Sequence, residues 1–217
     1  MLKLKLQFHA APGHTTPLRA GTYDNLQLNA GIFLKNLDYS SIANAAALKS
    51  AITSAISAGT TLLGATRGGG SFVVQRDMRT PDIDGNRYGF KGDTFVDKID
   101  ARLSTTLVEV TLDHIKDALP GASITGSAPK RTLKLSTAIS TADYLTNLCW
   151  IGDLADGRYV LICLKNALNE GDLNLTFVDK GEGTITVEFH AKQASVNDYD
   201  EAPFEVVELS PATGGVT

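Results

Sequence analysis

Alternation of apolar and polar residues is the dominant pattern along the chain, and it predicts a protein built mainly of β-strands. Within residues 97–110, apolar residues or threonine occupy every second position from 99 to 107. One face of this strand is therefore expected in a core and the other against water or a partner. The same pattern predicts further strands at residues 25–34 (with a bend at Gly31), 131–136, 145–152, 158–165, 173–178 and 184–191.

A helical period replaces the alternation between Ser41 and Ala58, where apolar residues recur three or four positions apart. Ser40 and Ser41 are available as N-terminal caps, and Gly59 follows the last turn. The face opposite the apolar stripe is rich in alanine and carries Lys49 as its one charged residue. This amphipathic helix either lies on its own domain or has its second face covered in an assembly.

Residues 112–119 form a second, shorter predicted helix, with Thr111 as its cap. Strands do not alternate regularly with helices, which disfavours a doubly wound parallel sheet. We therefore expect a mainly β (α+β) fold in a single domain over residues 1–217. Its parts are an N-terminal arm at 1–22, a core at 24–208 and a mobile C-terminus at 209–217.

Glycine and turn-forming residues mark the middle of the chain. The glycine-rich sequence from Gly64 to Val74 superficially resembles a phosphate-binding loop. A P-loop needs Gly-Lys-Ser/Thr at the start of a helix, whereas these glycines lead into β-branched and aromatic residues, so nucleotide binding is not expected. Pro81 and Asp84-Gly85-Asn86 then supply turn chemistry, which predicts a projecting hairpin or long loop at 76–94.

Composition excludes several functional classes. Hydrophobic residues make up 43% of the 217 residues and charged residues 20%, as in a folded, soluble chain rather than a disordered or membrane-embedded one. Twenty Lys and Arg against twenty-four Asp and Glu give a net charge of -4, so the chain has no overall basic field for tight nucleic-acid binding. Lysines interrupt the apolar residues of Met1–Leu6, so we expect no secretory core and a chain that stays in the cytoplasm in which it is made.

The chain contains two cysteines, Cys149 and Cys163. If Asp156-Gly157 forms a two-residue hairpin turn, Cys149 faces Leu164, and the two thiols lie one step apart in register on neighbouring strands. In a cytoplasmic chain we interpret them as small buried hydrophobic residues rather than as a disulfide or a metal site.

Residues with catalytic or metal-binding potential are scattered. The four histidines include no pair at the spacing of metal ligands, and His190, at the end of an alternating strand, is expected on its solvent side. No nucleophile elbow occurs, and the carboxylates between residues 77 and 100 lie in turn-rich sequence, where Asp commonly stabilises turns. We therefore expect no enzyme activity, no cofactor and no metal.

Several short stretches, in order along residues 24–208, resemble the major tail tube protein (major tail protein) of long-tailed bacteriophages. These stretches are 28–36, 63–72, 83–88 with Lys91-Gly92, 166–168, 173–177, 186–192 and 202–205. None is a catalytic fingerprint, and the resemblance rests on their number and order. It implies an antiparallel β-sandwich or barrel-like tail tube fold with a flanking α-helix and an extra amphipathic helix.

The resemblance also implies how the subunits assemble and where they act. Subunits would close into hexameric rings that stack into a hollow tube, assembled in the bacterial host cytoplasm and retained in the virion tail. The implied partners are other copies of the chain, the tail tip or initiator, tape measure and tail terminator proteins, and the double-stranded DNA that passes through the bore. No membrane is implied.

A tube needs one contact that closes a ring and a second that propagates. Edge strands that pair between neighbours would supply the first contact. The N-terminal arm and the 76–94 hairpin are the candidates for the second. The expected ring-stacking residues on the hairpin are Arg79, Arg87, Tyr88, Phe90 and Lys91.

Charge bears on how DNA would move through such a tube. A ring of six subunits carries six times -4, or -24. A basic bore would hold DNA, whereas an acidic or neutral bore lets it slide. At physiological salt, only carboxylates within about 8 Å of the DNA would act on it. The candidates for the lumen wall are Asp97, Asp100, Asp172 and Glu188, which lie on or beside predicted strands.

Two other functions stay open. A tube subunit of a contractile phage tail or of a phage-derived bacteriocin would share the same fold. A carbohydrate-binding or hydrolytic β-sandwich would need a row of exposed aromatic residues or a close pair of carboxylates. Aromatic residues make up 7% of the chain, and the lone Trp150 lies in a predicted core strand, which disfavours this function.

Overall fold

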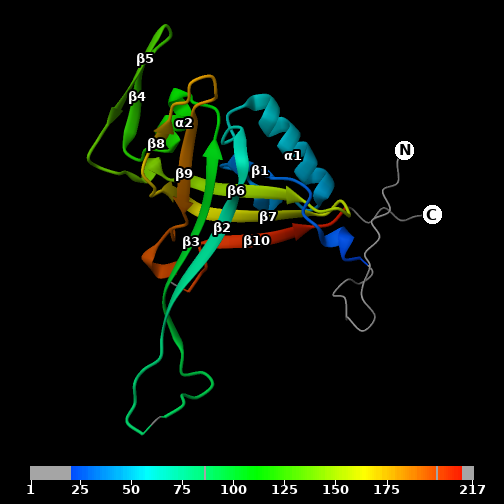
Figure 1. Cartoon of the computed structure of the whole chain (residues 1–217), viewed down its shortest axis with the longest axis vertical. Coiled ribbons are helices and arrows are strands. Elements are labelled where there is room, and N and C mark those ends of the chain that lie inside the picture. The colour runs from blue at the N-terminus through cyan, green and yellow to red at the C-terminus, as the bar shows by residue number, and fades with distance from the viewer. Residues whose placement is uncertain (1–20, 86, 199, 212–217) are drawn as a thin grey trace, which may run out of the picture.

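The computed structural model describes residues 21–85, 87–198 and 200–211 (Figure 1). The N-terminal arm expected at 1–22 lies almost wholly outside these residues, and so does most of the C-terminus expected at 209–217. The described residues form two α-helices, α1 (Ala45–Ala58) and α2 (Leu112–Asp117). Their β-strands are β1 (Ile32–Lys35), β2 (Thr66–Arg79), β3 (Phe95–Leu107), β4 (Ala122–Ser127), β5 (Lys130–Leu135), β6 (Leu145–Asp153), β7 (Tyr159–Asn169), β8 (Asn174–Thr176), β9 (Thr184–His190) and β10 (Phe204–Leu209).

All strand pairs in the described chain are antiparallel, which confirms the predicted mainly β fold. One group of strands has the order β1–β6–β7–β10, and a second has the order β8–β9–β3–β2. β7 connects the two groups, because its residues up to Leu164 pair with β10 whereas Leu168 and Asn169 pair with β9. β4 and β5 form a separate hairpin.

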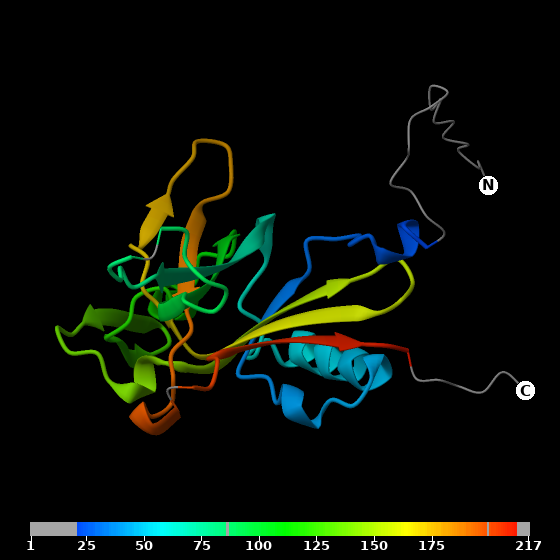
Figure 2. The same ribbon diagram turned by 90° about the horizontal axis from the view of Figure 1, so that it is seen from below.

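The two groups of strands pack face to face through a common core. Phe33 and Leu164 from the first group meet Leu103 and Phe189 from the second, and each is at most 2% exposed. Burial of such a side chain contributes about 1.5–3 kcal/mol. A second cluster lies between α1 and the other face of the first group, where Leu48 is fully buried. The Ala45 amide at the start of α1 donates to the carbonyl of Ser210, just after β10, at 3.1 Å, and Figure 2 shows these two ends close together.

α1 ends where the sequence predicts but begins later. Gly59 follows the helix in the left-handed conformation, with a φ of +68°, as expected for a C-terminal glycine. The predicted start is wrong, because the helix begins at Ala45. Its N-cap is Asn44 rather than Ser40 or Ser41, and the Asn44 side chain accepts a hydrogen bond from the Ala47 amide at 2.9 Å. Asparagine is as good an N-cap as serine, so the residue type alone did not decide between them.

α2 has the predicted cap, since the Thr111 hydroxyl accepts a hydrogen bond from the His114 amide at 3.2 Å. The helix is shorter than the predicted 112–119 and ends at Asp117. The β4–β5 hairpin that follows includes a strand, β4, that the alternation of residues did not predict. Figure 1 shows this hairpin at the opposite end of the molecule from the loop between β2 and β3.

β1 is shorter than the strand expected at 25–34, because the continuous strand begins only at Ile32. The chain bends at Gly31, whose φ is +73°, and a Cβ added there would lie 2.4 Å from the indole nitrogen of Trp150. The bend lets the carbonyl of Ala30 accept a hydrogen bond from that nitrogen at 3.0 Å. The position of the indole therefore determines where the strand starts.

The β6–β7 hairpin has a three-residue loop, residues 155–157, rather than the predicted two-residue turn; a backbone hydrogen bond of 2.9 Å closes it. Gly157 has a φ of +85°, typical of this loop type. The extra residue moves the register by one, so Cys149 lies opposite Cys163 instead of Leu164. Both cysteines are fully buried, as predicted, but they form a disulfide rather than remaining separate thiols.

β2 and β3 form a long hairpin whose inner half lies on the core. The predicted alternation of β3 is confirmed there, because residues 101, 103, 105 and 107 are buried. Near the inner end, the pairing register of β2 with β3 shifts between Thr66 and Gly70. Gly70 has no room for a side chain, because an added Cβ would lie 2.6 Å from the carbonyl oxygen of Ser104. The strands stay paired out to Arg79 and Phe95, and the loop of residues 80–94 projects away from the body (Figure 1).

Candidate assembly surfaces

The outer half of the β2–β3 hairpin carries large apolar side chains that the described chain leaves in contact with solvent. Tyr88 is 97% exposed and Phe90 is 74% exposed, both on the projecting loop. Further exposed apolar residues along the hairpin are Met78, Ile83, Phe95, Val96 and Ile99. Large apolar side chains gathered in this way on one exposed segment are typical of an interaction site.

Local contacts give this hairpin a defined shape despite its exposure. The guanidinium of Arg79 bonds to Asp97 across the two strands at 3.0 Å and lies over the ring of Phe95, 5.9 Å from its centroid. In the loop, a carboxylate oxygen of Asp93 accepts the backbone amide of Phe90 at 2.7 Å. Such exposed ion pairs contribute less than about 1 kcal/mol, so they orient the hairpin more than they stabilise the protein.

The five residues expected to stack rings therefore do not share one environment. Arg79 belongs to the paired part of the hairpin and is neutralised by Asp97. Arg87, Tyr88, Phe90 and Lys91 lie on the loop, and the two cations form no ion pair with any described residue.

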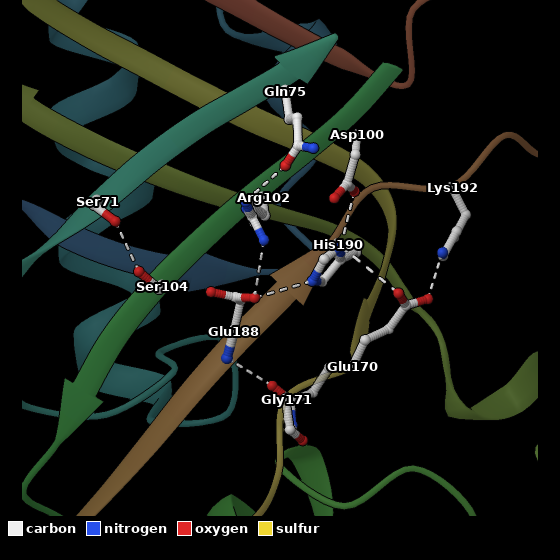
Figure 3. Close-up of polar contacts among 11 residues, drawn as sticks. Ser71, Gln75, Asp100, Arg102, Ser104, Glu170, Gly171, Glu188, His190 and Lys192 are labelled. Carbon is white, nitrogen blue, oxygen red and sulfur yellow. Dashed lines mark hydrogen bonds and ion pairs between the residues drawn. The ribbon is translucent and has the colours of Figure 1, made fainter. Parts of the chain in front are cut away.

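The face of β2, β3 and β9 that points away from the core carries a network of polar side chains (Figure 3). We call its centre the His190 cluster, which consists of Asp100, Arg102, Glu170, Glu188, His190 and Lys192. The Nδ1 atom of His190 lies 2.8 Å from Asp100 Oδ1, and its Nε2 atom lies 3.2 Å from Glu188 Oε1. Arg102 reaches the same oxygen of Glu188 at 3.5 Å, and Lys192 pairs with Glu170.

His190 contradicts the sequence prediction, because its side chain is 10% exposed rather than on the solvent side. Strand alternation does place it on the outer face, but Asp100, Glu170 and Glu188 surround the ring there. Burial works to raise the pKa of Asp100, but the hydrogen bond and charge of His190, aided by Arg102 and Lys98, lower that pKa below its ordinary value.

Two of the four lumen candidates, Asp100 and Glu188, meet in the His190 cluster, although they are far apart in sequence. The other two do not join them. Asp97 is bound to Arg79 on the hairpin, and Asp172 lies exposed on the connection between β7 and β8. Strand alternation placed Asp100 and Glu188 on the outer faces of β3 and β9, but the pairing of those strands was needed to bring them together.

A groove of about 400 Å³ opens between the two layers of strands; we call it the inter-layer groove. Its apolar walls include Phe33, Phe72, Leu103, Trp150 and Ile162, and residues 68–70 of β2 form one rim. The Trp150 indole packs against two glycines, Gly31 and Gly152. A Cβ atom added at either position would lie 2.4 Å from the ring. The sequence showed Trp150 on a core strand but not that it lines a groove.

The described residues include no group arranged to hold a metal ion, and neither of their helices has the length and hydropathy to span a bilayer. No protein-family model matches the chain, and a search of curated proteins finds no match.

Proposed function

We propose that this chain is the structural subunit of a bacteriophage tail tube, which forms stacked hexameric rings whose lumen conducts DNA. The observation that carries the proposal is the projecting β2–β3 hairpin, whose tip exposes most of the Tyr88 and Phe90 side chains to solvent. The order of the resembling stretches over residues 24–208 and the two packed antiparallel layers flanked by α1 support the same function. In this proposal the role is structural rather than enzymatic.

The hairpin suits a contact that propagates. It extends from one end of the molecule (Figure 1), so in a stack its tip would reach a different surface on the next copy. A contact between two different surfaces that does not close on itself builds a filament. Burial of Tyr88 and Phe90 in each such contact would contribute about 3 kcal/mol apiece, taking roughly 25 cal/mol per Å² over somewhat more than 100 Å² each.

Edge strands suit the contact that closes each ring. Within the described chain, β2 pairs with β3 alone and β10 with β7 alone, whereas the outer edge of β1 bonds to residues 61–63. An unpaired edge offers a row of backbone donors and acceptors to a neighbour. We propose that such edges join the six subunits of a ring.

The outer face of β2, β3 and β9 suits the wall of a DNA channel. The cations in the His190 cluster, Arg102 and Lys192, are already bound to Glu188 and Glu170. Phosphate groups would therefore find no unpaired cation in this cluster, which favours sliding of DNA over binding. We propose that Asp100 and Glu188 face the lumen, with the tail tip or initiator, tape measure and tail terminator proteins as further partners in the virion tail.

Two alternatives compete with this proposal. A tube subunit of a contractile tail or of a phage-derived bacteriocin would use the same surfaces. A carbohydrate-binding β-sandwich finds less support, because the single Trp150 lines a groove rather than an exposed aromatic row. For a hydrolytic β-sandwich, the carboxylates of Asp100 and Glu188 do come together, but both are bonded to His190.

Replacement of Tyr88 and Phe90 by alanine tests the proposal. We expect the double variant Tyr88→Ala/Phe90→Ala to remain folded and to form no tubes by electron microscopy and sedimentation. The variant Val196→Ala is the matched control, because Val196 is 89% exposed and lies outside the hairpin. Tubes of normal length from the double variant would refute the stacking role of the hairpin.

A further inference from the structure

The end of the molecule opposite the projecting loop carries a second group of exposed apolar side chains. We call it the end surface; it consists of the β4–β5 hairpin, Val110 and the turn of residues 177–183, and Figure 1 shows the hairpin and the turn at this end. On the turn, Phe177 is 84% exposed and Val178 is 55% exposed, and Val110 is 45% exposed. Large apolar side chains gathered at one exposed end are typical of an interaction site.

Local contacts hold the parts of the end surface together. A Cβ added at Gly183 would lie 3.6 Å from Cγ2 of Val110, so this valine packs beside the turn. Arg131 of β5 bonds to Asp113 at 2.7 Å, which joins the β4–β5 hairpin to the first turn of α2. The hairpin and the turn are therefore both anchored around the short connection between β3 and α2.

The charges of the end surface and of the projecting loop are complementary. The β4–β5 hairpin contains three cations and no carboxylate. Two of these cations, Lys130 and Lys134, are exposed and form no ion pair with any described residue. In the loop, Asp82 and Asp84 are exposed and likewise have no ion pair within the described chain. Attraction between such charges orients two molecules as they meet.

The loop and the end surface lie at opposite ends of one strand. β3 begins beside the loop and ends at Leu107, three residues before Val110, and its 13 residues span about 40 Å. Seen along the long axis of the molecule, the loop lies between the β4–β5 hairpin and the turn of residues 177–183 (Figure 2). A second copy displaced along this axis would therefore bring its loop onto the end surface of the first copy.

We propose that the projecting loop of one copy docks on the end surface of the next copy. The aromatic side chains of the loop would contact the apolar side chains of the turn, and the two aspartates would face the two lysines of the β4–β5 hairpin. The contact joins two different surfaces, so it repeats along the axis instead of closing on itself. The inference rests on the proposed function, since it identifies the surface that receives the stacking hairpin.

Charge reversal in the full-length chain tests the pairing. Lys130→Asp/Lys134→Asp and Asp82→Lys/Asp84→Lys should each raise the concentration at which half of the protein sediments by about tenfold or more, because two attractions become two repulsions. The chain with all four substitutions should sediment as the unmodified chain does. An equimolar mixture of the two double variants should also assemble, because each loop then meets an end surface of opposite charge on the other variant.

The matched control adds Asp24→Lys/Asp200→Lys to Lys130→Asp/Lys134→Asp, at exposed positions outside the loop and the end surface. It has the net charge of the unmodified chain, and its assembly should remain impaired. High salt should reduce the defect of both double variants, because it screens exposed charges. Far-UV circular dichroism confirms that every variant is folded.

The apolar part of the contact has its own test. Phe177→Ala should raise the half-sedimentation concentration by roughly tenfold, as expected for an aromatic residue at the centre of an interface. Salt should not reduce this defect, since no charge is removed. Val196→Ala, at an equally exposed position outside the end surface, should leave the concentration unchanged.

The outcomes separate this inference from the proposed function. Normal tubes from both double variants and from Phe177→Ala would overturn the inference and leave the tube function standing. Impairment that the fourfold variant does not restore would also overturn the inference. Filaments without a hollow bore that show the same loss and restoration would support the inference and contradict the tube function. A chain that stays monomeric at every concentration would overturn both.

Discussion

Asn169 connects three parts of the structure, and its replacement should be costly. Its amide nitrogen donates to the carbonyls of Ala118 at 2.7 Å and Gly171 at 3.1 Å, while its oxygen accepts the amide of Glu188 at 2.7 Å. The residue is 3% exposed, so water cannot readily replace these bonds. Asn169 thereby ties the end of α2 and the start of the β7–β8 connection to β9, next to the His190 cluster.

Asn169→Ala should lower the free energy of unfolding by about 3 kcal/mol. The buried carbonyl of Ala118 and the partly buried amide of Glu188 would each lose a short hydrogen bond, at about 1–3 kcal/mol each, and partial relaxation would recover some of this cost. For a chain of this size, such a loss corresponds to a fall in melting temperature of roughly 6–12 °C. Urea denaturation followed by circular dichroism measures it directly.

Asn169→Asp separates hydrogen bonding from side-chain volume. Its second oxygen would face the carbonyls of Ala118 and Gly171, to which the native amide donates. The neutral acid can still donate one of these bonds, so the folded-state pKa of the new carboxyl should be raised and the destabilisation should shrink as pH falls. Asn174→Ala, at an exposed position of β8, is the control. A loss in Asn169→Ala no larger than in the control would refute the reasoning.

Two further predictions concern the groove and the His190 cluster. Gly152→Ala should lower the free energy of unfolding by about 1–3 kcal/mol and alter the near-UV circular dichroism of Trp150, because the added Cβ would lie 2.4 Å from the indole. The control Gly59→Ala places its Cβ with no atom within 4 Å, but at a φ of +68°. It should lower the free energy of unfolding by only about 1 kcal/mol and leave the Trp150 signal unchanged. Asp100 has a lowered folded-state pKa, so its contribution to stability is present above the ordinary pKa of 3.8 and is lost as pH falls through the folded value. Asp100→Asn removes the charge beside His190, so the variant should have a lower free energy of unfolding than the unmodified chain at neutral pH. Urea denaturation at a series of acidic pH values should show that this difference in free energy becomes smaller as pH falls. A difference that does not change with pH would contradict this account.

Local patterns were sufficient to predict several elements of the fold. The period of apolar residues predicted α1, and Gly59 predicted its end, because a left-handed residue after the last turn is a local requirement. The alternation of β3 predicted its buried face correctly. These features depend on near neighbours in sequence, which is why the sequence alone reveals them.

Features that depend on contacts between distant residues were predicted incorrectly. The start of β1 depends on the Trp150 indole, more than a hundred residues away in the chain. The register of Cys149 and Cys163 depends on one extra loop residue, and Asp-Gly is compatible with either loop length. Rules for single strands could not reveal these contacts.

The candidate site shows the same division. The exposed aromatic residues of the hairpin follow from turn-rich sequence around Tyr88 and Phe90, which lack partners in a core. The burial of His190 does not follow from sequence, because the carboxylates around it come from β3, β9 and the connection after β7. An alternating strand shows which face a residue occupies, but only the neighbouring strands determine what covers that face.

Electron microscopy of the purified, full-length chain over a concentration series, paired with light scattering, tests the central claim most directly. Assembly through a hairpin contact and an edge contact predicts rings and, at higher concentration, hollow tubes that lengthen by the addition of rings. A closed two-fold dimer, or a monomer at every concentration that also binds glycans, would contradict it.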